Sequence, residues 1–145
     1  MKVVLQRVKK AKVEVEDTIY GKIDNGLLVL VGFTYNDTVE DIKKMVDKVI
    51  NLRIFDDENK VMNKSLIDVN GNILSVSQFT LYADTKKGRR PSYVKALNGE
   101  EAIKLYDIWN EELKKYAHVE TGKFGADMQV SLINDGPVTI IIENE

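Results

Sequence analysis

The chain of 145 residues has no cysteine and a single histidine, His118. Without cysteine it can form neither disulfides nor thiolate metal sites, and it has no cysteine nucleophile. A Ser-His-Asp triad or a histidine-rich metal site would have to use His118. That residue follows a predicted helix, where a histidine is more typical of a surface or capping position. We therefore expect no metal site and no cofactor.

Long apolar runs and an excess of one charge are also missing. The first ten residues, MKVVLQRVKK, lack the apolar segment of a signal peptide, and no run approaches the length of a membrane span. The formal net charge is −2, so any nucleic-acid contact has to use a local basic patch. We expect one domain over residues 1–145, located in the cytoplasm, with neither a membrane nor DNA as a partner.

Strand patterns dominate what is present. Alternating or continuous β-branched and apolar residues predict strands over 3–8, 11–16, 26–33, 52–55 and 72–83, and two more within 128–143. Lys9-Lys10 is expected to connect the first two strands. The polar segment 56–71 is expected to be a loop with a short helical turn.

Two helices are predicted among these strands. Thr38 and Asp41 form a capping-box start for the first helix, and the residues that follow at helical spacing are Val39, Ile42, Met45, Val46, Val49 and Ile50. Asn98 is the expected N-cap of the second helix, and its apolar stripe consists of Ile103, Tyr106, Trp109, Leu113 and Tyr116. Strands covered by two helices predict a single α+β domain.

The segment MQVSLINDGPVTIIIE, residues 128–143, places one of the two prolines inside an otherwise strand-forming stretch. Proline donates no backbone hydrogen bond and is excluded from central strands. One interpretation is that Asn134-Asp135-Gly136 is a hairpin turn whose register Pro137 fixes. The other is that a rigid Gly136-Pro137 backbone is presented to a ligand or partner.

Polar side chains also interrupt the predicted strand LSVSQFTLYAD, residues 74–84. Strand alternation would put Gln78 and Thr80 on one face and Ser77 and Phe79 on the other. These polar groups fit cross-strand pairing at a sheet edge. They equally fit the floor of a pocket whose hydroxyl and N–H groups face a ligand.

Two neighbouring segments could contribute to such a pocket. TKKGRR, residues 85–90, holds four cations, Lys86, Lys87, Arg89 and Arg90, which suit either a solvated loop or contacts to phosphates. TGKFGADMQV, residues 121–130, sets Phe124 between two glycines and before Met128. These residues suit a flat apolar ligand such as a nucleobase, or a tight turn packed on the core.

Together these blocks resemble the D-aminoacyl-tRNA deacylase family, also called D-Tyr-tRNA(Tyr) deacylases. The resemblance covers essentially the whole chain through LQRV, GLLVLVG, LRIF, VSQFTLYADTKKGRRPS, TGKFGADMQVSL and NDGPVT. It implies a barrel-like core of mainly antiparallel sheets covered by two helices, and a homodimer. It also implies hydrolysis of D-aminoacyl-tRNA to a free D-amino acid and tRNA.

The resemblance further implies roles for individual residues. The pocket for the aminoacylated 3′ adenosine, with the catalytic positions, would be formed by Ser77, Gln78, Phe79 and Thr80. Gly136-Pro137, with a cis peptide bond, would enter the active site of the other subunit and reject L-amino acids through its backbone, with Arg7 as support. The adenosine would be held by Phe124, Gly125, Ala126 and Met128, and the tRNA backbone by Lys86, Lys87, Arg89 and Arg90.

The chemistry implied by the family leaves two roles open for Thr80. It could act as a nucleophile, although no neighbouring base is visible in the sequence, or it could position substrate or water, which we favour. The ribose hydroxyl beside the ester could assist hydrolysis itself, so no histidine base would be needed. Glycine mischarged on alanine tRNA is an expected second substrate. The alternatives are a non-catalytic tRNA-binding module of the same fold and an esterase for small esters.

Overall fold

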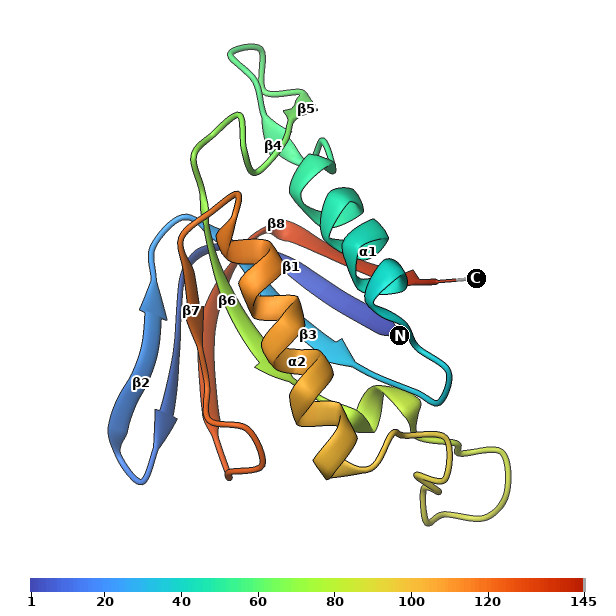
Figure 1. Cartoon of the computed structure of the whole chain (residues 1–145). Coiled ribbons are helices and arrows are strands. Elements are labelled where there is room, and N and C mark those ends of the chain that lie inside the picture. Colours follow the sequence, from blue (N-terminus) through green and yellow to red (C-terminus); the bar gives the residue numbers. More distant parts are fainter. Residues whose placement is uncertain (145) are drawn as a thin grey trace.

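A computed structural model describes residues 1–144 (Figure 1). Its main sheet has the strand order β2-β1-β3-β6-β7, with β8 paired to the remaining edge of β1. The strands of this sheet are β1 (Lys2–Val15), β2 (Thr18–Ile23), β3 (Gly26–Gly32), β6 (Asn72–Ser77), β7 (Val119–Thr121) and β8 (Gln129–Glu143). A second, two-stranded sheet pairs β4 (Phe55–Asp56) with β5 (Met62–Lys64). The predicted domain of residues 1–145 ends at Glu145, outside the described residues.

The sheet curls into a nearly closed barrel. β1 pairs antiparallel with β3 through its first half, with β2 through its second half and with β8 along its length. The pairs β3–β6 and β6–β7 are parallel, the exceptions in a mainly antiparallel arrangement. β2 returns to β7 at Gly21, where an added Cβ would lie 2.6 Å from the carbonyl oxygen of Thr121. The predicted α+β class and barrel-like core are therefore confirmed.

Two helices, α1 (Val39–Asn51) and α2 (Gly99–Lys114), cover one face of the sheet (Figure 1). The predicted capping box is present, since Thr38 Oγ1 accepts from the Asp41 N–H and Asp41 accepts from the Thr38 N–H. Asn98 caps α2 by accepting from the Glu101 N–H at 3.0 Å. No helix in residues 1–144 is long and apolar enough to cross a bilayer.

The core has two parts. The first lies between the helices and the sheet, with Trp109, Leu5 and Ile42 fully buried in it. The second fills the curl of the sheet with Val8, Ala11, Val13, Ile23, Leu28, Leu74 and Val76. The stripe prediction for α2 was wrong at its two ends: Ile103 is partly exposed, and Tyr116 lies beyond the last helical residue and is half-exposed.

The first strand prediction was wrong at Lys9-Lys10, which does not connect two strands. β1 runs unbroken through both lysines, and its pairing with β8 shifts register between Val8 and Lys10. Both lysine side chains are exposed at this irregularity. Pairing with β8 along the whole strand therefore keeps Lys9 and Lys10 extended, although two adjacent lysines locally favour a connection.

The hairpin predicted at Asn134-Asp135-Gly136 was also wrong, because β8 is one strand. Val8 pairs with Asn134 and Gln6 pairs with Thr139, so the four residues 135–138 oppose Arg7 alone. Asn134 closes this bulge: its side-chain oxygen accepts from the Val138 N–H at 2.8 Å, and its amide donates to the Val138 carbonyl at 3.3 Å. The residues that predicted a turn therefore form a wide bulge inside a paired strand.

Two shorter segments also differ from the prediction. The strand expected over 72–83 ends at Ser77 and is followed by η1 (Phe79–Tyr82), a 3₁₀ helix. The predicted alternation of residues 77–80 between two faces is therefore wrong. The strand expected at 52–55 is reduced to β4, and the loop of 56–71 contains β5.

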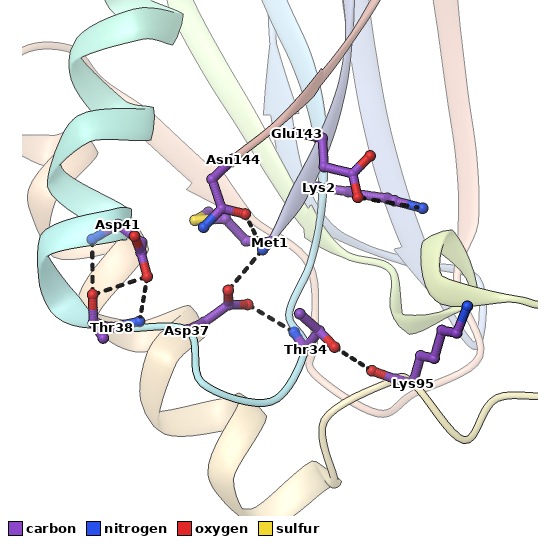
Figure 2. A network of polar contacts seen from close by, with 9 residues as sticks. All are labelled: Met1, Lys2, Thr34, Asp37, Thr38, Asp41, Lys95, Glu143 and Asn144. Atoms are coloured by element: carbon purple, nitrogen blue, oxygen red, sulfur yellow. Dashed lines mark hydrogen bonds and ion pairs between the residues drawn. The ribbon is translucent and has the colours of Figure 1, made fainter.

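The start of β1 and the end of β8 are tied to the segment before α1 through Met1 (Figure 2). The Met1 amine is fully buried and lies 2.8 Å from Asp37 Oδ1, and it also donates to the side chain of Asn144. The other oxygen of Asp37 accepts from the Thr34 N–H at 2.7 Å. This ion pair and its hydrogen bonds fix the loop that leads from β3 into α1.

Candidate active site

A cavity of about 570 Å³ lies where β6 ends, between η1, the first turn of α2 and the segment 124–128. Three of the four residues predicted from SQFT line it, namely Ser77, Gln78 and Phe79. The predicted adenosine residues line it as well: Phe124, Gly125, Ala126 and Met128. The structure thus brings together two segments that lie more than forty residues apart in the sequence.

The SQFT segment is positioned by the neighbouring strand. The Gln78 N–H donates to the Val31 carbonyl at 2.8 Å, which continues the β3–β6 pairing by one residue. β3 approaches closely at Gly32, where an added Cβ would lie 2.8 Å from the Gln78 carbonyl oxygen. This close approach requires glycine, so the conformation of residues 77–80 depends on the end of β3.

The start of η1 leaves backbone donors beside the cavity. The first hydrogen bond within η1 runs from the Leu81 N–H to the Gln78 carbonyl at 3.3 Å. The N–H groups of Phe79 and Thr80 precede this bond and have no acceptor within the helix. Such adjacent N–H groups can stabilise a developing oxyanion.

Thr80 is not among the residues that line the cavity, although its N–H directly follows that of Phe79, which does line it. Its hydroxyl accepts a short hydrogen bond from the Gln78 side-chain amide. Among the contacts of residues 1–144, no histidine or carboxylate approaches this hydroxyl as a base would. Phe79 is 54% exposed at the cavity, and its ring meets Tyr93 edge-on with centroids 5.2 Å apart.

Tyr106 supports the opposite wall. Its hydroxyl donates to the Ser75 carbonyl at 2.7 Å, and its ring lies 5.8 Å from that of Phe124. Burial raises the pKa of Tyr106 above its ordinary value, although the hydrogen bond with Ser75 opposes this rise. The Tyr106 hydroxyl therefore stays neutral at physiological pH and keeps its hydrogen bond to Ser75. This bond fixes the ring against which Phe124 packs.

Gly136-Pro137 lies elsewhere on the molecule. Both residues are exposed, their peptide bond is cis, and neither lines the cavity described above. Arg7 is 8% exposed beside them. Its Nε donates to the Asp135 carbonyl at 2.7 Å, and its Nη1 donates to the Ile54 carbonyl at 2.7 Å. Arg7 therefore joins the bulge of β8 to the start of β4.

The four predicted phosphate-binding cations form an exposed loop directly after η1. The loop is closed by paired backbone hydrogen bonds between Asp84 and Ser92, at 2.8 and 2.9 Å. The Asp84 carboxylate accepts from the Lys86 N–H at 3.0 Å, which lowers the pKa of that carboxyl. Because Tyr93 follows this closure and contacts Phe79, the cationic loop is coupled to the cavity wall.

Several residues that line the cavity were not predicted from the sequence. They are Gly32, Phe33, Val76, Leu97, Gly99, Ala102, Asp127 and Val130. Most are apolar and come from β3, from α2 and from the connection before it. Gly32, at the end of the continuously apolar run 26–33, was the one available signal, because a glycine there marks close approach of another backbone.

A model of the D-Tyr-tRNA(Tyr) deacylase family matches residues 4–143. The chain belongs to this family. A D-aminoacyl-tRNA deacylase of Thermosipho africanus is 58% identical over 100% of this chain and 98% of that protein. A D-aminoacyl-tRNA deacylase of Bacillus cytotoxicus is 56% identical over 100% of both chains. The family resemblance of the sequence is therefore confirmed.

Two solved structures are similar to this member of the deacylase family. One, named c-Myc DNA Unwinding Element Binding Protein, has a TM-score of 0.95 and 42% identity, covering 100% of this chain and 99% of its own. The other, described as a probable eukaryotic D-amino acid tRNA deacylase, has a TM-score of 0.85 and 20% identity, covering 97% of both chains. The second likeness concerns the fold alone.

Proposed function

We propose that this chain hydrolyses the ester bond of D-aminoacyl-tRNA and releases a free D-amino acid and tRNA. The observation that carries the proposal is the cavity shared by Ser77, Gln78 and Phe79 with the segment 124–128. It is large enough for an aminoacylated nucleoside and combines an aromatic ring and a thioether with backbone donors. Its two defining segments are those that carry the family resemblance.

The terminal adenosine occupies the part of the cavity formed by Phe124, Gly125, Ala126 and Met128. The ester carbonyl then lies at the start of η1, where the N–H groups of Phe79 and Thr80 receive the developing oxyanion. One such donor is typically worth about 10²–10³ in rate. The chain's contribution is therefore placement and charge stabilisation.

Thr80 positions the substrate or water through its hydrogen bond with Gln78. A nucleophilic role requires a base to take the hydroxyl proton, and the one side-chain hydrogen bond of this hydroxyl among residues 1–144 comes from the Gln78 amide, which is no base. The 2′-hydroxyl of the terminal ribose lies next to the ester and assists hydrolysis itself. This arrangement accounts for a site without histidine.

The chiral filter is supplied by a second copy of the chain. Gly136-Pro137 is exposed and lies outside the chain's own cavity, so it acts only on the cavity of a partner subunit in a homodimer. A backbone wall excludes the side chain of an L-amino acid by collision. Since the wall has no long side chain, it tolerates many D-amino acids. Glycine has no side chain to exclude, so glycine mischarged on alanine tRNA is also a substrate.

The cationic loop with Lys86, Lys87, Arg89 and Arg90 contacts the tRNA backbone. Each phosphate contact makes binding more sensitive to salt. This partner implies a cytoplasmic location, where aminoacyl-tRNA is made and used.

Two other functions compete with hydrolysis. One is a tRNA-binding module without catalysis. The other is DNA binding, suggested by the name of the solved structure that is 42% identical. The intact SQFT and GPVT segments favour the deacylase over both.

The test is a paired deacylation assay with D-Tyr-tRNA and L-Tyr-tRNA at equal concentration. We expect rapid loss of the D ester alone. Loss of both esters would remove the chiral filter from the proposal, and tRNA binding with loss of neither would leave the binding module. Duplex DNA added as a competitor should not inhibit the reaction, and strong inhibition would favour the DNA-binding candidate.

A further inference from the structure

A second cavity, of about 540 Å³, adjoins the candidate active site between α2, β2 and β7. Phe124 lines both cavities and is therefore part of the wall of each. The second cavity also contains Tyr20, Asp107, Asn110, Glu111 and Lys123. None of these five residues takes part in the proposed hydrolysis.

Tyr20 presents a flat, accessible ring at this cavity. It projects outward from β2 beside buried Gly21 and is 48% exposed. Lys123 Nζ lies 5.9 Å from the centre of the ring. An exposed aromatic ring with a nearby cation is the arrangement on which proteins stack single-stranded bases.

The other wall of this cavity offers hydrogen-bond acceptors. Asp107 and Glu111, one helical turn apart, supply carboxylate oxygens, although Glu111 is also paired with Lys114 at 3.1 Å. The charges of Asp107 and Glu111 are balanced by those of Lys114 and Lys123, which also line the cavity. The cavity therefore favours a planar N–H donor over a phosphate.

We propose that this second cavity binds the base of the nucleotide that precedes the terminal adenosine of tRNA. This inference rests on the proposed function, which puts the terminal adenosine on the other side of Phe124. The preceding base in tRNA is cytosine, whose exocyclic amine is a donor for amide or carboxylate oxygens. Bases of a single strand can be splayed apart, so the cytosine stacks on Tyr20 while its amine meets the carboxylates of Asp107 and Glu111.

The test combines changes in the RNA and in the protein. Full-length tRNA carrying D-tyrosine is prepared with cytosine, with uracil or with no base at the penultimate position. We expect removal of the base to lower kcat/KM about tenfold, the typical effect of losing one stacked base. Uracil, which has a carbonyl in place of the amine, should also lower it. Tyr20→Ala should cause a similar loss with the cytosine tRNA and little further loss with the abasic tRNA.

Tyr116→Ala is the matched control, since Tyr116 is 51% exposed and lies outside both cavities. It should leave all three rates unchanged. Equal rates on the three tRNAs would overturn the proposal. It would also be overturned if Tyr20→Ala lowered the rate on the abasic tRNA by the same factor as on the cytosine tRNA, because the two changes would then act independently. Equal rates with cytosine and uracil would overturn it as well. If the unmodified protein failed to deacylate the normal D-Tyr-tRNA, the proposed function itself would be wrong.

Discussion

Arg7 Nε donates a 2.7 Å hydrogen bond to the carbonyl oxygen of Asp135, the residue directly before Gly136-Pro137. The same guanidinium reaches the Ile54 carbonyl and lies 3.4 Å from Asp56. Arg7 is also the single residue of β1 that faces the bulge of β8. One buried side chain therefore fixes the orientation of the exposed segment that we assign to chiral selection.

Arg7→Lys should weaken both the fold and the selection. Lysine keeps the charge but lacks the planar fork that serves the carbonyls of Asp135 and Ile54 together. Because hydrogen bonds to charged groups contribute about 1.5–3 kcal/mol each, we expect the free energy of unfolding to fall by roughly 2–3 kcal/mol. Urea unfolding measures this loss, and the ratio of D to L deacylation rates should fall with it. Arg53→Lys is the control, because exposed Arg53 also donates to a carbonyl, that of Asn63.

Gly136→Ala should impair selection more than stability. An added Cβ would lie 2.5 Å from the Val138 nitrogen and 2.8 Å from its Cγ2, so the exposed bulge has to move. We expect the ratio of D to L rates to fall at least tenfold, because a shift of about 1 Å in a positioning group is enough to cost that much. An unchanged ratio in a variant with normal unfolding behaviour would contradict the proposed filter.

Thr80→Ala distinguishes positioning from nucleophilic attack. Loss of a nucleophile typically costs about 10⁶ in kcat, whereas loss of a positioning hydroxyl costs about 10–10². We expect the smaller loss, measured as single-turnover deacylation of D-Tyr-tRNA. Mass spectrometry of the quenched wild-type reaction should find no D-tyrosyl adduct on the protein. An adduct at Thr80 would establish the nucleophilic role instead.

A 2′-deoxyadenosine at the 3′ end of the tRNA should nearly abolish turnover. The ester on the remaining hydroxyl is intact, so binding should persist while the assisting hydroxyl is gone. The measurements are the dissociation constant of the deoxy substrate and its single-turnover rate. Normal turnover would mean that the protein, and not the RNA, supplies the missing group.

Stability should fall when the pH drops below about 4. Backbone N–H groups lower the pKa of Asp41, Asp57, Asp68 and Asp84 below the ordinary value of 3.8. The unfolded chain therefore takes up protons first as the pH falls. Each carboxylate contributes stability that is present above pH 3.8 and is lost through its lower folded pKa. The urea midpoint should hold between pH 7 and pH 5 and then decline. A variant with Asn at all four positions should decline less steeply.

The sequence predicted those elements whose determinants are local. Thr38 and Asn98 are capping residues with the acceptors that start a helix, and β3 is apolar at every position because both of its faces are covered. The wrong predictions came from long-range pairing. Asn134-Asp135-Gly136 has the composition of a hairpin turn, yet pairing with β1 on both sides keeps β8 extended. A local pattern contains no information about that partner.

The residues of the candidate site were likewise predicted where the signal is local and missed where it depends on the fold. The segments around 77–80 and 121–130 were chosen from their residue types, and the structure brings residues of both to one cavity. Leu97 and Ala102 could not be chosen, because their place in the wall depends on how α2 crosses the sheet. The separation of Gly136-Pro137 from the chain's own cavity likewise depends on the curl of the sheet.

The position of the β8 bulge has a consequence for accuracy. A hairpin tip is attached at one end of a ladder and drifts with thermal motion, whereas this bulge is followed and preceded by paired residues, at Gln6–Thr139 and Val8–Asn134. Telling a hydrogen from a side chain at one carbon requires a wall that is placed to within about 0.5 Å. Pairing on both sides of the bulge suits the backbone wall that we propose for Gly136-Pro137, which uses no side chain to recognise the substrate. The precision with which this segment is placed then depends on the rigidity of the whole barrel.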